Sequence, residues 1–190
     1  MYMIEIKKLT PELCDKWLGF FDGIAFSDHG EWAFCYCIEG HMTRADNDAL
    51  SDHAERREYA KKMILEGKMQ GYLAFEGDTV VGWCNANDRD NYAYIKELFD
   101  YQKYMPDKRK TKSVFCFLVA PAYRGQGIAG QFLKRVCDDA GQDGFERVEA
   151  YPFSDVSLQY QFHGTEKMFL NNGFSKLADF GLMNVVAKDL

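Results

Sequence analysis

Residues 122–130, AYRGQGIAG, combine an arginine with glycines in a spacing that suits the binding of a phosphate group. Gly125, Gly127 and Gly130 spell Gly-x-Gly-x-x-Gly, the pattern of loops that hold a dinucleotide pyrophosphate. From Arg124 the same residues spell a second pattern, Arg-x-x-Gly-x-Ala. In both patterns glycines leave the N–H groups at a helix N-terminus uncovered for an anion, and here the arginine adds positive charge. The segment therefore predicts a pyrophosphate site, and its surroundings must decide the ligand.

The surroundings of the loop do not suit a dinucleotide fold. Such a fold places its first glycine directly at the end of a strand, whereas residues 121–124 separate Ala120 from Gly125. Glu149 follows at about the distance expected of a ribose-binding acid, but only roughly 60 residues remain after Gly125, too few for the missing strand and helix units. A Walker loop is excluded because no Gly-Lys-Ser/Thr follows.

The elements that must position the loop alternate along the chain. We expect strands at 3–9, in a hairpin at 69–87, at 113–121, at 145–153 and twice within 175–190. We expect helices from Thr10-Pro11 onward, at 48–66, at 92–102, at 127–144 and at 166–174. This alternation predicts an α/β (α+β) protein, a mixed sheet with helices on both faces.

Composition limits the function classes. With 190 residues and 47% hydrophobic content, we expect a single domain spanning 1–190. The net charge of −6 argues against a nucleic-acid partner and favours a cationic substrate such as an amine. The longest apolar run, 114–120, is too short to cross a membrane, and the N-terminus lacks the apolar block of a signal peptide. We expect a soluble cytoplasmic protein with reduced cysteines and no membrane partner.

The strand FCFLVAP, the loop YRGQGIA, the helix GQFLKRV and the late MFLNNGF before two strands resemble the GNAT superfamily of N-acetyltransferases. The resemblance implies a mostly antiparallel sheet of six or seven strands and acetyl-CoA as cosubstrate. It implies that the backbone of Leu118 and Val119, beside a bulge, pairs with the pantetheine arm. The pyrophosphate would be held by the loop residues Arg124, Gly125, Gln126, Gly127, Ile128 and Ala129. The thioester would lie between the strands at 113–120 and 146–151, where backbone donors can polarise its carbonyl.

The catalytic groups of the family cannot be transferred directly. Many members carry a tyrosine, the general acid for the leaving thiolate, where this chain has Phe169, and an asparagine that holds pantetheine is replaced by Phe162-His163. Tyr151 and His163 are candidate acids, and Glu149 is a candidate base. Each has a structural alternative: strand-end packing for Tyr151, helix capping for His163 and a solvent-facing position for Glu149.

Other polar residues leave further alternatives open. Asp88 and Asp90 are also candidate bases, while Asn85 and Asn87 share one sheet face that is either a substrate pocket or an exposed surface.

The segment 31–41, EWAFCYCIEGH, offers three ligand-type side chains, Cys35, Cys37 and His41, in a spacing unlike that of zinc sites. We expect no metal there and interpret the segment as an aromatic wall over the acceptor site, which the family places in this region.

From this resemblance we expect the chain to transfer acetyl from acetyl-CoA to a primary amine of a small molecule, or less readily of a protein or peptide. The alternative is a non-catalytic acyl-CoA-binding or sensor domain of the same fold, favoured by Phe169. A homodimer is left open.

Overall fold

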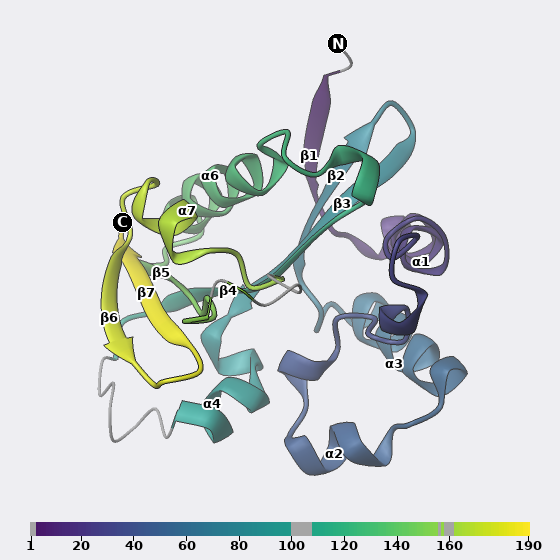
Figure 1. The fold of residues 1–190 in the computed structure, drawn as a ribbon, viewed down its shortest axis with the longest axis horizontal. Helices are drawn as coiled ribbons and strands as arrows, with labels where there is room; N and C mark the ends of the chain where they lie inside the picture. The colour runs from purple at the N-terminus through teal and green to yellow at the C-terminus, as the bar shows by residue number, and fades with distance from the viewer. Residues whose placement is uncertain (1–2, 100–107, 156, 158–161) are drawn as a thin grey trace.

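The computed structural model describes residues 3–99, 108–155, 157 and 162–190, and its strands form one sheet (Figure 1). The strands are β1 (Ile4–Lys8), β2 (Gly71–Glu76), β3 (Thr79–Asp88), β4 (Thr111–Val119), β5 (Arg147–Ala150), β6 (Ser175–Asp179) and β7 (Asn184–Asp189). Their order across the 7-stranded sheet is β1-β2-β3-β4-β5-β7-β6. Every neighbouring pair is antiparallel except β4 and β5. The mixed, mostly antiparallel sheet predicted from the sequence is confirmed.

Helices cover both faces of the sheet (Figure 1). They are α1 (Cys14–Asp22), α2 (Arg44–Ala49), α3 (His53–Leu65), α4 (Ala93–Phe99), α6 (Ile128–Gln142) and α7 (Glu166–Leu170). Short 3-10 turns lie at Pro11–Leu13, Gly30–Trp32, Glu39–His41, Arg89–Asn91 and Pro121–Tyr123. Within the part of the chain that the structure describes, no helix has the length and apolar character needed to cross a bilayer.

The single helix expected at 48–66 is two helices. Thr43 caps α2 by accepting a hydrogen bond from the Asp46 N–H, and Asp52 caps α3 by accepting from the Ala54 and Glu55 N–H groups. A capping aspartate at position 52 starts a new helix instead of continuing the old one. Of the helix expected at 92–102, α4 spans Ala93–Phe99, and residues 100–102 lie outside the described residues.

The two sheet faces carry separate cores. On one face, Phe132, Val136 and Ile128 of α6 pack with Phe117 and Phe169. On the other, aromatic side chains from α1, β3 and the loop after α1 pack together, with the rings of Trp17 and Phe21 stacked at 4.1 Å. Burial of apolar surface on both faces explains why the central strands read as continuous hydrophobic runs.

The strands β4 and β5 diverge. They pair only from Thr111↔Arg147 to Val114↔Ala150, where β5 ends, while β4 continues to Val119. In the β3–β4 pairing, Asn85 opposes Cys116 and Ala86 opposes Val114, so Phe115 is the extra residue of a bulge in β4. The second half of β4 therefore has one edge that β5 does not cover, next to the glycine-rich loop.

Candidate functional site

The glycine-rich loop ends at the N-terminus of α6. Gly127 is the N-cap residue with φ 79°, and Gly125 has φ 74°, a left-handed conformation that glycine adopts without strain. A Cβ atom placed on either glycine would meet no atom within 4 Å beyond its chain neighbours. The first N–H groups of a helix lack partners within the helix and attract anions. The loop thus presents free space and helix N–H groups together, which fits a pyrophosphate.

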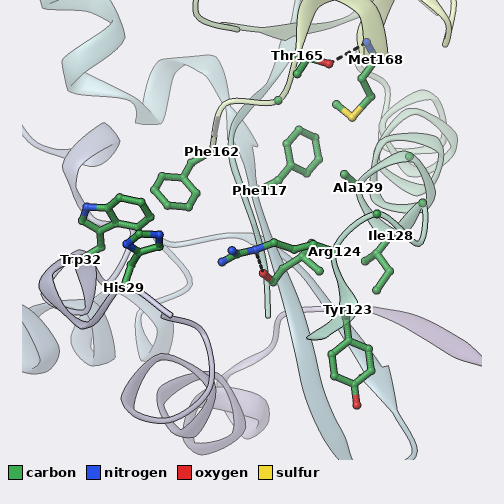
Figure 2. A pocket seen from close by; sticks show the side chains of 15 residues that line it. His29, Trp32, Phe117, Tyr123, Arg124, Ile128, Ala129, Phe162, Thr165 and Met168 are labelled. Carbon is green, nitrogen blue, oxygen red and sulfur yellow. Dashed lines mark hydrogen bonds between the residues drawn. The ribbon is translucent and has the colours of Figure 1, made fainter. Parts of the chain in front are cut away.

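A cavity of about 620 Å³ opens beside this loop, within the size range of small-molecule sites (Figure 2). It is lined by His29, Trp32, Phe117, Val119, Tyr123, Arg124, Gly125, Gly127, Ile128, Ala129, Gly130, Phe162, Gly164, Thr165 and Met168. Three walls contribute: the end of β4 with the loop and α6, the segment 162–168, and the segment 29–32.

Six of the eight residues expected at the cofactor line this cavity, and Leu118 and Gln126 do not. The Leu118 side chain is buried in the core on the α1 face. The exposed Gln126 side chain donates a hydrogen bond to the Ala122 carbonyl. At these two positions only the backbone groups are available to a ligand.

The backbone direction along β4 distinguishes Leu118 from Val119. The Ala120 N–H donates to the Val81 carbonyl of β3 at 2.9 Å, and the Phe117 N–H donates to the Phe162 carbonyl at 2.6 Å. Backbone N–H groups point alternately to the two edges of a strand. The Leu118 N–H therefore points to β3, and the Val119 N–H points to the edge that β5 does not cover. The Val119 carbonyl there accepts a hydrogen bond from Arg124 Nε at 3.0 Å.

Arg124 also pairs with the carboxylate of Asp28, across the cavity. Its Nη1 lies 2.5 Å from Asp28 Oδ2 and its Nη2 lies 3.3 Å from Oδ1. The hydrogen bond from Arg124 holds the pKa of the Asp28 carboxyl below its ordinary value. In Figure 2 the Arg124 side chain extends from the loop toward the side of the cavity where His29 lies.

Tyr151 and Glu149 form one buried polar network under the β4–β5 pairing. The Tyr151 hydroxyl lies 2.7 Å from the Ser113 hydroxyl and 3.4 Å from Glu149 Oε2. Glu149, fully buried, pairs with Arg89 at 3.4 Å and with Arg147 at 4.0 Å. Glu149 is therefore not solvent-facing, and neither residue lines the cavity described above.

His163 lies between the diverging strands. Its ring packs edge to face with Phe115 of the β4 bulge and with Phe153 after β5, both at 4.9 Å between centroids. Burial lowers the pKa of His163 to about 4, and its Nδ1 is buried without a hydrogen-bond partner among the described residues. The imidazole is therefore neutral at pH 7, and so low a pKa also makes it a weak base, which argues against both a proton-donor and a proton-acceptor role. Thr165, not His163, caps α7 by accepting from the Met168 N–H.

Phe169 stands where the family often has tyrosine, and it is fully buried between Phe117 and Phe174. A Cβ atom placed on Gly164, which lines the cavity, would lie 3.2 Å from Phe169 Cζ. The Cε2 atom of the same ring would lie still closer, at 2.9 Å, so the edge of the Phe169 ring packs against Gly164.

The remaining candidate bases have structural roles. Asp88 accepts a hydrogen bond from the Asp90 N–H, and Asp90 is exposed and pairs with Lys96. Asn85 and Asn87 are fully buried and hydrogen-bonded to loop residues, so the sheet face that they share is neither exposed nor part of this cavity.

Cys35, Cys37 and His41 lie near one another without forming a metal centre. Asn85 Nδ2 lies 3.3 Å from Cys37 Sγ and 3.1 Å from His41 Nε2. Among the residues that the structure describes, no group of three or more His, Cys, Asp or Glu side chains is placed to hold a metal ion. The aromatic wall lies slightly earlier in the chain, where the rings of His29 and Trp32 stack at 3.9 Å and Trp32 meets Phe162 at 5.4 Å.

The sequence did not single out Asp28 or His29 as site residues, and it marked Trp32 only as part of the aromatic segment 31–41. Spacing does not reveal these three because they come from an irregular loop whose position depends on packing against β4 and the segment after β5.

The family profile of the Acetyltransferase (GNAT) family matches residues 30–161, so the chain belongs to this family. Its members use acetyl-CoA as cosubstrate. No curated protein sequence matches the chain significantly.

Solved structures confirm the fold. The PaiA N-acetyltransferase of Thermoplasma acidophilum, in complex with coenzyme A, has a TM-score of 0.59 and 14% identity over 99% of both chains. The polyamine N-acetyltransferase of Drosophila melanogaster has a TM-score of 0.59 and 11% identity, covering 99% of this chain and 100% of that chain. A ribosomal-protein-alanine N-acetyltransferase of Brucella melitensis has a TM-score of 0.56 and 15% identity over 98% of this chain and 99% of its own.

Proposed function

We propose that this protein is a cytoplasmic, single-domain N-acetyltransferase that moves acetyl from acetyl-CoA to the primary amine of a small molecule. One observation carries the proposal: the cavity is lined by two left-handed glycines, Gly125 and Gly127, beside the start of α6, with open space where their side chains would be. Family membership supports acetyl-CoA as the ligand for this space.

The proposed cofactor contacts follow the cavity wall. The pyrophosphate binds Arg124 and the N–H groups from Gly125 to Ala129, because these groups supply positive charge and unpaired donors. The pantetheine arm runs along the uncovered edge of β4 at Val119. Gln126 contributes its backbone N–H only, since its side chain lies outside the cavity, and Leu118 is a neighbour of the arm, since its backbone groups face β3.

The reaction that we propose is direct attack of the amine nitrogen on the thioester carbonyl, with the thiolate as leaving group. A thiol has an ordinary pKa near 8.5, so a thiolate departs at neutral pH without an obligatory proton donor. This accommodates Phe169 in place of a tyrosine. Tyr151, joined to Ser113 and Glu149, is the remaining candidate acid, and Glu149 is the candidate proton acceptor.

The shape of the cavity supports a small acceptor. The rings of His29, Trp32 and Phe162 form a continuous aromatic wall opposite the loop, which suits the aliphatic part of an amine or its cationic head. Among structures of this fold, the Drosophila enzyme is described as acting on polyamines and agmatine, and the Brucella enzyme as acting on ribosomal protein. A peptide acceptor is therefore the secondary form of the proposal, and a homodimer is compatible with it.

A second candidate is a non-catalytic acyl-CoA-binding domain. Two observations favour it: Phe169 lacks the hydroxyl of the usual acid, and the Phe162 carbonyl already accepts a hydrogen bond from the Phe117 N–H at the edge of β4. Such a domain would bind acetyl-CoA but release no thiol.

A thiol-release assay separates the two candidates. The protein is mixed with acetyl-CoA and a panel of polyamines, amino acids, aminoglycosides and peptides. Free thiol is measured, and acetylated products are identified by mass spectrometry. We expect release of free thiol with at least one small amine and equal formation of its N-acetyl product. Acetyl-CoA binding without thiol release across the panel would identify the sensor instead.

A further inference from the structure

The ion pair between Arg124 and Asp28 joins two opposite walls of the cavity. Arg124 belongs to the loop before α6, and Asp28 belongs to the segment that leads into the aromatic wall. Both guanidinium Nη atoms contact the carboxylate, at 2.5 and 3.3 Å, while Nε donates to the Val119 carbonyl. All three nitrogens of this guanidinium are thus occupied, including those expected to meet the pyrophosphate.

Asp28 is tied closely to the aromatic wall. It directly precedes His29, whose ring stacks on Trp32 at 3.9 Å. The backbone around it is a chain of tight turns, with the His29 N–H bonded to the Phe26 carbonyl and the Trp32 N–H bonded to the His29 carbonyl. A displacement of Asp28 therefore displaces the wall that would contact the acceptor.

We propose that the Asp28 carboxylate competes with the CoA pyrophosphate for Arg124, so that cofactor binding releases the segment 28–32 from the phosphate loop and repositions the acceptor wall. This inference rests on the proposed function, because it requires the pyrophosphate to bind at the loop.

The competition follows from charge and exposure. A guanidinium fork makes two parallel bonds to one carboxylate or phosphate at a time, so Arg124 cannot keep both Asp28 contacts and bind the pyrophosphate in the same way. The ion pair is about one third exposed, with side-chain exposures of 40% for Arg124 and 35% for Asp28. Ion pairs at this exposure contribute little net stability. The pyrophosphate carries more charge than the Asp28 carboxylate and also accepts hydrogen bonds from the N–H groups at the start of α6, so it replaces the carboxylate.

The first test compares Asp28→Asn with Asp138→Asn by titration calorimetry. Asp138 is a matched control because it pairs with Lys134 at the same 2.5 Å on α6, and neither residue lines the cavity. Asp28→Asn should tighten binding of CoA by about two- to fivefold, the range of an exposed ion pair. Pantetheine lacks the pyrophosphate, so its affinity should be the same in the wild type and both variants.

The second test asks whether Asp28 acts through Arg124 and moves the wall. In an Arg124→Gln background, Asp28→Asn should no longer change the affinity for CoA. CoA should also change the tryptophan fluorescence of the wild type, and Trp32→Phe should remove that change, because Trp17 and Trp83 are fully buried.

Five results would overturn the inference. If CoA binds the wild type but Asp28→Asn binds it no more tightly, or tightens pantetheine equally, Asp28 does not compete with the pyrophosphate. If the gain persists in Arg124→Gln, the effect is not exerted through Arg124, and if CoA leaves Trp32 fluorescence unchanged, the wall does not respond. If the wild type binds no CoA at all, the proposed function fails as well, which separates that failure from the others.

Discussion

Gly127→Asp should abolish most CoA binding with little additional loss of stability compared with its control. Gly127 has φ 79° and open space around a Cβ. Gly144, after α6, has φ 74° and equally open space, but it does not line the cavity. Gly144→Asp is therefore a matched control, with the same backbone strain and the same added charge at a distant position.

The expected magnitudes separate strain from ligand contact. A non-glycine residue in the left-handed region costs about 1–2 kcal/mol, so both variants should melt about 2–8 °C below the wild type. At position 127 the new carboxylate would lie about 5 Å from the pyrophosphate, and repulsion at an effective dielectric constant of about 20 costs roughly 3 kcal/mol before solvent screening. CoA affinity should fall between about tenfold and 100-fold.

Calorimetric titration with CoA and a thermal melt of each variant measure both quantities. Gly127→Ala adds only a methyl group and should fall between the wild type and Gly127→Asp in affinity. The reasoning is refuted if Gly127→Asp binds CoA as tightly as Gly144→Asp does, because the loop would then be structural only.

Further predictions concern the acid–base groups and pH. Phe169→Tyr should raise kcat, since the Phe169 ring packs against Gly164 of the cavity wall and the new hydroxyl would restore the family's usual acid; an unchanged kcat would show that position 169 does not reach the thioester. Tyr151→Phe should lower kcat by about 10²- to 10⁴-fold with near-normal CoA binding if Tyr151 is the acid, and a loss of only a few-fold would remove it from that role. Burial lowers the pKa of His163 to about 4, so the unfolded chain, with an ordinary histidine pKa, binds more protons between about pH 4 and 6.5. The free energy of unfolding should therefore fall as the pH drops through that window, and His163→Gln should flatten the fall; denaturant titrations that give the same pH profile for both proteins would contradict this.

Sequence patterns predicted the sheet, the hairpin and the helix after the loop because each depends on local periodicity or on glycines that stop or start an element. The break between α2 and α3 was missed, since a charged helical pattern runs across the capping Asp52. The left-handed loop at Gly125 and Gly127 was readable because only glycine adopts that backbone freely.

The other parts of the site depend on long-range packing and could not be read from spacing. The Asp28–Arg124 pair joins residues 96 positions apart. The sequence left Glu149, beside Val148 and Ala150, either as a candidate base or as a solvent-facing residue, and Arg89 and the parallel pairing with β4 bury it. The neutral state of His163 follows from burial against two phenylalanine rings, Phe115 in the middle of β4 and Phe153 after β5.

Hydrogen exchange measured by mass spectrometry, with and without acetyl-CoA, tests the central claim most directly. A pyrophosphate bound at the start of α6 should slow exchange in peptides covering 122–131, while β6 and the turn that follows it at Gly181, none of whose residues lines the cavity, should exchange at an unchanged rate. Protection confined to other segments, with unchanged exchange at 122–131, would contradict the assignment of this loop as the cofactor site.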